Sequence, residues 1–173
     1  MCIRDRKVTG EILGLNYWKQ YGVDVRGLRF PGLISWRAPV GGGTTDYAVD
    51  IFRAAVEYGH YECFVSEDTR LPMMYMDDAI RATERIMQVD LESLGDSRTG
   101  YNIKGISFTA GELADKIAER IPGFTCDFIP DFRQKVAESW PNDVDDQSAR
   151  DDWGWKADYD LGRMVDEMIS NIS

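Results

Sequence analysis

Apolar residues in the first part of the chain recur at helical spacing and then give way to a run typical of a strand. In residues 7–21 the apolar positions are Val8, Ile12, Leu13, Leu15, Tyr17 and Trp18. This spacing predicts a helix that Gly22 closes at its C-terminal end. Residues 23–30 carry β-branched and apolar side chains and are followed by Pro31-Gly32, so we predict a strand there.

The rest of the pattern alternates short apolar runs with amphipathic ones. Further helices are predicted over 45–58, 77–87, 132–140, 148–153 and 161–172, and further strands over 61–65, 71–76, 101–103, 107–108 and 124–129. Thr109 followed by Glu112 is a capping-box signature, which predicts one more helix after Thr109. Residues 91–100 are polar and are expected to form a loop. Strands alternating with helices favour a parallel α/β architecture with a smaller mixed layer.

Composition excludes several classes of partner. The 173-residue chain has a formal net charge of −10. This argues against nucleic-acid binding, because such binding depends on Lys and Arg side chains that neutralise the phosphates. No apolar run reaches the roughly 20 residues of a membrane helix, and no leader resembles a signal peptide. The three cysteines are scattered, which favours a reducing compartment over a disulfide framework. We therefore expect an intracellular soluble protein with no membrane partner, in either the cytoplasm or the mitochondrial matrix.

A glycine-rich loop is the strongest candidate for chemistry. Gly41-Gly42-Gly43 is followed by Thr44-Thr45 and Asp46 at the predicted start of the helix over 45–58. Backbone amides, hydroxyls and a helix N-terminus together suit a carboxylate ligand. The two threonines could instead serve as N-caps, or one could cap while the other binds. Asp46 is expected to set the loop or to bind an ammonium group.

Elsewhere the residues offer no metal-ligand spacing. Asp77 and Asp78 are adjacent acids at the predicted start of a helix, where carboxylates are favourable. We interpret them as helix-capping residues and predict no metal site.

Lys7, with Gly10 and Glu11 after it, resembles the second half of the Y-x-x-x-K-x-x-G-E helix of extended short-chain dehydrogenases. Residues four apart share a helix face, so the ammonium would lie beside the phenol, lower its pKa and hold the cofactor ribose. Ile3 stands where that family has its catalytic tyrosine. Because residues 1–6 fit the following pattern poorly, we expect them to be a non-native leader on a truncated chain.

Six further segments are distinctive: R-G-L-R-F-P-G-L-I-S-W, G-G-G-T-T-D-Y-A, D-T-R-L-P-M-M-Y-M-D-D-A-I-R-A, Y-N-I-K-G-I-S-F-T, D-F-R-Q and S-W-P-N-D-V-D-D. Through these segments the wider chain is similar to the NAD-dependent threonine dehydrogenases of the extended short-chain, or epimerase/dehydratase, family. The resemblance implies the C-terminal part of such an enzyme: a parallel-sheet Rossmann remnant plus a small mixed α/β substrate-binding lobe. The remnant would comprise about 7–35 and 77–105, and the lobe about 36–76 and 106–173.

The resemblance also implies an activity, the oxidation of L-threonine to 2-amino-3-oxobutanoate with NAD as cofactor. Lys7 would be catalytic and bind NAD, while Gly32 and Leu33 would flank the nicotinamide. The substrate contacts would be Gly43, Thr44, Thr45, Asp46 and Trp140. An intact protein of this kind is expected to be a homodimer, with the helices over 7–21 and 45–58 near its interface.

Two alternatives remain at this stage. A nucleotide-sugar epimerase or dehydratase of the same superfamily should carry more basic or amide side chains in the loop, to bind a diphosphate. A non-catalytic remnant or dimerisation module would need neither NAD nor threonine. The chain as written lacks both the tyrosine and a glycine-rich dinucleotide fingerprint, so we expect it to be inactive alone.

Overall fold

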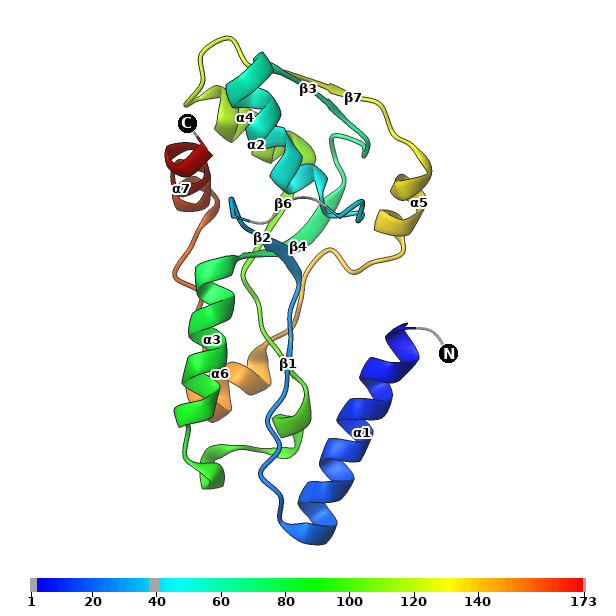
Figure 1. Ribbon diagram of the computed structural model, residues 1–173, viewed down its shortest axis with the longest axis vertical. Coiled ribbons are helices and arrows are strands. Elements are labelled where there is room, and N and C mark those ends of the chain that lie inside the picture. Colours follow the sequence, from blue (N-terminus) through cyan, green and yellow to red (C-terminus); the bar gives the residue numbers. More distant parts are fainter. Residues whose placement is uncertain (1–2, 38–40, 173) are drawn as a thin grey trace.

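The computed structural model describes residues 3–37 and 41–172, which form an elongated molecule of two stacked lobes (Figure 1). The lower lobe contains α1 (Ile3–Tyr21), β1 (Leu28–Arg29), α3 (Met76–Gln88), the 3-10 helices η1 (Leu91–Ser93) and η2 (Asp96–Thr99), β5 (Tyr101–Asn102) and α6 (Gln147–Trp153). The upper lobe contains α2 (Tyr47–Tyr58), β3 (His60–Cys63), α4 (Ala110–Ala118), β7 (Thr125–Phe128), α5 (Phe132–Glu138) and α7 (Leu161–Ile172). Between them lie β2 (Gly32–Ile34), β4 (Arg70–Tyr75) and β6 (Ile106–Thr109).

Parallel pairing dominates the strands and confirms the predicted α/β class. β1 pairs with β5, β2 with β4, and β3 with β7, all in parallel. Among the strands of the described residues, β6 alone runs antiparallel to its neighbour, β4. Because successive side chains on a strand point to opposite faces, β4 contributes side chains to the cores of both lobes. Met73 and Tyr75 join the upper core, whereas Met74 joins the lower one.

Two hydrophobic cores follow from this arrangement. The upper core packs α2, α4 and α7 over the strands, with Ile51, Phe52, Leu113 and Met168 fully buried. The lower core joins α3 and β5 to α6, and includes Ala82, Tyr101, Ala149, Trp153 and Trp155. The core of the lower lobe thus also contains residues from the C-terminal part of the chain, in α6 and just after it. Within 3–37 and 41–172, no helix is long and apolar enough to cross a membrane.

The first helix differs from its prediction in length and in burial. α1 begins at Ile3 and ends before Gly22, whose φ of 67° and N–H bond to the Trp18 carbonyl confirm the predicted C-terminal glycine. Its apolar residues do not form a buried stripe, since four of them are exposed: Val8, Ile12, Leu13 and Tyr17. α1 packs closely at the buried Gly14, where a Cβ atom would lie 2.8 Å from Val25 Cγ1.

Two other predicted boundaries are wrong. The strand expected over 23–30 is reduced to β1, and the loop expected over 91–100 contains η1 and η2. Ile80 on α3 and Val56 on α2 are apolar but exposed, whereas Ala82 and Phe52 on the same helices are fully buried. Each helix therefore buries only a narrow apolar stripe.

The capping box at α4 is confirmed and carries an additional ion pair. Glu112 N–H donates to Thr109 Oγ1 at 3.0 Å, and Thr109 N–H donates to Glu112 Oε2 at 2.9 Å. Arg70 donates to Glu112 Oε1 at 2.6 Å and to the Ser107 carbonyl at 2.8 Å. The Thr109 N–H and then Arg70 lower the pKa of Glu112. Arg70 therefore braces β6 and α4 rather than pointing to a ligand.

Candidate functional site

Lys7 lies on an exposed stretch of α1 beside an open groove of about 620 Å³. The groove separates α1 from the segment that contains β1, and its lining includes Glu11, Arg26, Arg29 and Thr99. Within the described residues, Lys7 has no hydrogen bond or ion pair. An uncommitted ammonium in a groove of this size is suited to bind hydroxyl groups of a ligand.

Gly32, at the start of β2, touches the glycine-rich loop. A Cβ atom at Gly32 would lie 2.8 Å from Thr45 Cγ2 and 2.4 Å from Met73 Sδ, so only glycine leaves room for both neighbours. Leu33 follows on β2 opposite Met74, with 38% of its surface exposed. The strand expected to flank the nicotinamide thus meets the loop expected to bind substrate.

The loop itself is organised by Asp46. Its Oδ2 accepts the N–H groups of Gly41, Gly42 and Gly43 at 2.8, 2.6 and 2.8 Å. The prediction that Thr44 or Thr45 caps the following helix is wrong, because α2 begins at Tyr47 and the residue before it is Asp46. Asp46 makes no side-chain cap bond either, since its carboxylate turns back to the loop. A substrate carboxylate could reach these three amides only by displacing Asp46.

The threonine hydroxyls are the groups that the loop leaves free. Thr44 and Thr45 are half-buried, and neither hydroxyl has a hydrogen-bond partner in the described part of the chain. A half-buried hydroxyl that lacks a protein partner can donate to or accept from a small polar ligand. Together with the Gly32 contact, this makes Thr45 the best-placed ligand-binding side chain of the loop.

Removing the Asp46 carboxylate should release the loop. In the Asp46→Ala variant, the amides of Gly41, Gly42 and Gly43 lose their shared acceptor, so we expect their hydrogen exchange to accelerate at least about tenfold, the equivalent of about 1.4 kcal/mol. Amide exchange followed by NMR measures this directly. Asp46→Asn keeps one acceptor oxygen and should give a smaller effect. Unchanged exchange in the alanine variant would contradict the role assigned to the carboxylate.

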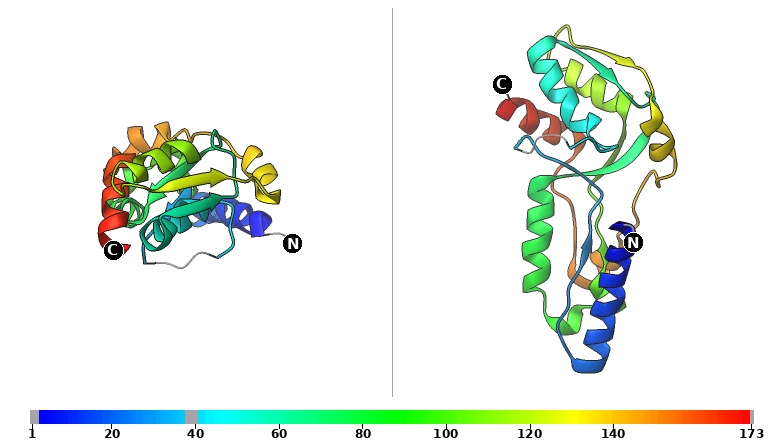
Figure 2. Two further views of the ribbon diagram at one scale, coloured as in Figure 1. Left: turned by 90° about the horizontal axis from the view of Figure 1, so that it is seen from above. Right: turned by 45° about the vertical axis from the view of Figure 1, so that its right-hand side comes forward.

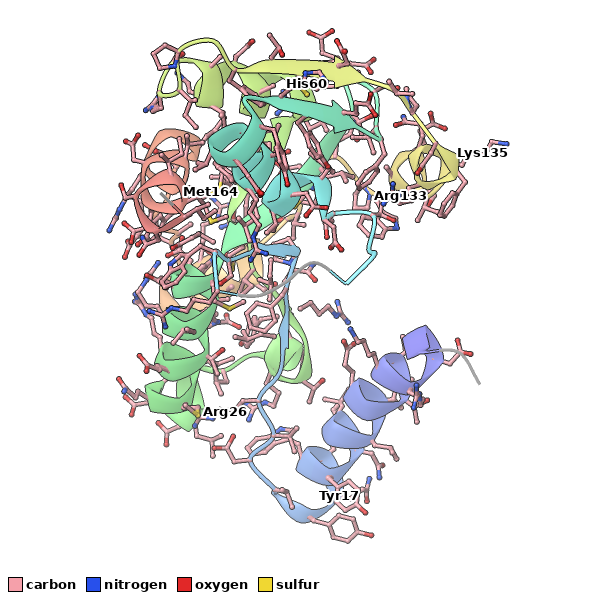
Figure 3. All side chains as sticks on the ribbon, turned by 45° about the horizontal axis from the view of Figure 1, so that its top comes forward. Tyr17, Arg26, His60, Arg133, Lys135 and Met164 are labelled. Atoms are coloured by element: carbon pink, nitrogen blue, oxygen red, sulfur yellow. The ribbon has the colours of Figure 1, made fainter. Side chains whose placement is uncertain are left out.

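Arg133 on α5 also belongs to this region, although it was not predicted as a site residue. Its guanidinium stacks on Phe64, 3.2 Å from the ring centre, and pairs with Asp131 at 2.7 Å. The hydrogen bond to Asp131 chiefly raises the pKa of Arg133, and the charge of Asp46 contributes in the same direction. Figure 3 shows the Arg133 side chain between α5 and the segment leading into α2. The D-F-R-Q segment was the only sequence signal for it.

Trp140 lies just beyond α5 and is 40% exposed. Its backbone N–H donates to the Ala137 carbonyl at 3.0 Å, which continues the last turn of the helix. The structure does not bring its ring into contact with the glycine-rich loop or with Lys7. Its assignment as a wall of the substrate site therefore stays a prediction.

Lys7 and the loop lie in different lobes and do not touch. The N-terminal end of α1 points toward the side of the molecule where α5 lies, as the two views of Figure 2 show together with Figure 1. In the described part of the chain, every tyrosine with a shifted pKa has it raised. Burial raises the pKa of Tyr75 and of Tyr101 to about 12, so neither is suited to accept a proton at neutral pH.

Acidic side chains do not assemble into a metal site in the described ranges, since no group of three potential ligands is close enough together. Asp77 and Asp78 lie in the first turn of α3, but the prediction that they cap this helix is wrong, because its N-cap is Tyr75 and no side chain makes a cap bond. The Asp78 side chain has another role. Its carboxylate accepts the N–H groups of Asp158 and Tyr159 instead, because the segment before α7 passes over the start of α3.

The chain is similar to known proteins over nearly its whole length. No family model matches the chain. A mitochondrial L-threonine 3-dehydrogenase of Bos taurus is 48% identical over 165 residues, which covers 95% of this chain and 44% of that protein. An uncharacterized epimerase/dehydratase of Staphylococcus aureus is 46% identical over 167 residues, covering 96% of this chain and 52% of that protein.

Solved structures agree with these relatives. The apo form of a GalE-like L-threonine dehydrogenase from Cupriavidus necator superposes with a TM-score of 0.92 at 52% identity, covering 96% of this chain and 60% of that one. Its holo form gives the same TM-score and identity, with 54% of that chain covered. The chain spans about half the length of the curated relatives it matches.

Proposed function

Because the chain belongs to the epimerase/dehydratase family and is homologous to its L-threonine 3-dehydrogenases, we propose that it supplies Lys7 and the substrate lobe of an NAD-dependent enzyme that oxidises L-threonine. The contact between Gly32 and Thr45 carries this proposal. It joins a strand suited to approach a nicotinamide to a loop suited to bind a small amino acid.

Different side chains would bind the cofactor and the substrate. The uncommitted Lys7 ammonium is suited to the ribose hydroxyls of NAD, and the open groove beside it leaves room for them. The hydroxyls of Thr44 and Thr45 would bind the threonine carboxylate, while Asp46 holds the loop in shape. NAD held beside Lys7 would supply the hydride acceptor for oxidation of the threonine hydroxyl.

Proton removal needs a base that the described residues do not offer. The family places a tyrosine four residues before its lysine, where an ammonium favours the phenolate. In this chain that position is Ile3, at the first turn of α1. We therefore propose that the 173-residue chain does not turn over threonine by itself, and that activity requires a tyrosine in place of Ile3 together with the part of its relatives that this chain does not span.

Kinetics of a full-length protein that carries these residues together with that tyrosine test the function. Purified protein should form NADH in the presence of L-threonine, whereas the 173-residue chain should not. Thr45→Val should raise the KM for threonine about tenfold, the loss of one hydrogen bond, with the KM for NAD nearly unchanged. Asn16→Ala, an exposed change on α1, is a matched control and should alter neither constant.

Other outcomes would favour the alternatives. Turnover of a nucleotide sugar without threonine oxidation would indicate an epimerase, and equal effects of Thr45→Val on both KM values would contradict the loop assignment. Threonine turnover by the 173-residue chain alone would contradict the proposed need for a tyrosine. We also propose that the active protein is a homodimer, which light scattering tests, and a monomeric mass would contradict it.

A further inference from the structure

We propose that Arg29 is a positioning residue for Lys7: it binds the Glu11 carboxylate at two points and so keeps that carboxylate from neutralising the Lys7 ammonium. The inference rests on the proposed function in one respect, that Lys7 is the group that must stay available. The ion pair itself and its geometry do not depend on that function.

Spacing makes Glu11 a natural partner for Lys7. The two residues are four apart on α1, so their side chains lie on one face of the helix. In the structure, however, both Glu11 oxygens are bound by Arg29. Arg29 Nε donates to Oε1 at 2.9 Å and Nη2 donates to Oε2 at 2.5 Å. Such two-point binding is stronger and more directional than a lysine contact.

The pair is built by three segments that converge. Glu11 comes from α1 and Arg29 from β1, and Arg29 Nη1 also donates to Asn102 Oδ1 on β5 at 3.4 Å. At Gly100, just before β5, a Cβ atom would lie 3.0 Å from Arg29 Nε and 3.1 Å from Glu11 Cδ. The φ of Gly100, −173°, is open to any residue, so the glycine serves here to leave room for the pair.

Electrostatics support the same assignment. The hydrogen bond from Arg29 lowers the pKa of Glu11, and the hydrogen bond to Glu11 raises the pKa of Arg29, so each favours the charged form of the other. Both side chains remain partly accessible, at 26% for Glu11 and 54% for Arg29. If Arg29 were removed, the Glu11 carboxylate would stay charged. Lys7, one helical turn away on α1, would then be the cation available to pair with it.

Chemical labelling of the chain tests this without any activity. An N-hydroxysuccinimide ester acylates free amines, and peptide mass spectrometry gives the rate at each lysine. In Arg29→Leu, Lys7 should be acylated about two- to fivefold more slowly, since exposed pairs shift such equilibria by modest factors. In Arg29→Leu/Glu11→Gln the rate should return to the original value. Lys19, exposed near the end of the same helix, is the internal control and should not change.

Two results would overturn the proposal. One is an unchanged Lys7 rate in Arg29→Leu, which would mean that Glu11 does not turn to Lys7. The other is slow labelling that persists in the double variant, because that would trace the effect to a displaced helix. Circular dichroism and the Lys19 rate show whether α1 remains folded.

The consequence for NAD is tested separately in protein that oxidises threonine. Arg29→Leu should raise the KM for NAD severalfold more than that for threonine, and Glu11→Gln should restore it in the double variant. Absence of threonine oxidation would defeat the proposed function yet leave the labelling result valid. A confirmed labelling result with an unchanged KM for NAD would overturn the positioning role.

Discussion

Replacing Asp78 with alanine is expected to lower the free energy of unfolding by about 3 kcal/mol, a large effect for one side chain. Asp78 is only 1% exposed. Its carboxylate accepts the Asp158 N–H at 3.0 Å and the Tyr159 N–H at 3.1 Å, and pairs with Arg81 at 2.7 Å. Without it, two backbone donors lose their acceptor where α3 meets the segment before α7.

Arg81 links several groups at the same junction between α3 and the segment before α7. It also donates to the Lys156 carbonyl at 2.6 Å, pairs with Asp158 at 3.0 Å, and lies 4.8 Å from the ring centre of Trp155. Loss of Asp78 removes one of the contacts that hold this guanidinium in place. The damage should therefore extend to the packing of the lower core beneath Trp155.

Urea unfolding followed by circular dichroism measures the change. The matched control is Asp77→Ala, because the neighbouring Asp77 is exposed and has a weak contact, 3.3 Å, with the Tyr159 hydroxyl. That variant should cost less than about 1 kcal/mol. Asp78→Asn keeps one acceptor and should fall between the two. Equal losses for Asp77→Ala and Asp78→Ala would show that burial of the Asp78 carboxylate contributes nothing.

Local patterns predicted the secondary structure where local forces decide it. The capping box at Thr109 needs only residues three apart, and Gly22 ends α1 through its own backbone freedom. Where the outcome depends on distant segments, the same rules failed. The apolar spacing of α1 predicts a helix correctly, but nothing within that segment shows that Ile12 and Leu13 stay exposed.

The site shows the same division. Lys7 stands out from the sequence because its motif resembles that of a known family, and the loop stands out because of its three consecutive glycines. Their immediate partners do not stand out, since the rest of α1 and a loop separate Glu11 from Arg29, and Arg133 lies far from Asp46 in the sequence. The role of Asp46 was open to two interpretations, and its three glycine contacts decide for loop organisation.

Lys7→Met is expected to lower kcat/KM for threonine oxidation by about 10²–10⁴-fold in protein that carries the family's tyrosine, because the ammonium both favours the phenolate and binds the ribose. Steady-state kinetics with NAD and threonine measure the loss. Lys7→Arg keeps a positive charge and should recover part of the activity. It should not recover all of it, since a planar guanidinium cannot reproduce the point contact of an ammonium.

Stability separates a catalytic role for Lys7 from a structural one. Lys7 is exposed and has no hydrogen bond or ion pair within the described residues, so Lys7→Met should change the free energy of unfolding by no more than about 0.5 kcal/mol. A loss of activity without a loss of stability would place the ammonium at the reacting groups. If activity and stability fell together, or if activity were retained, the proposed role of Lys7 would be wrong, and with it the assignment of the groove beside α1 to NAD.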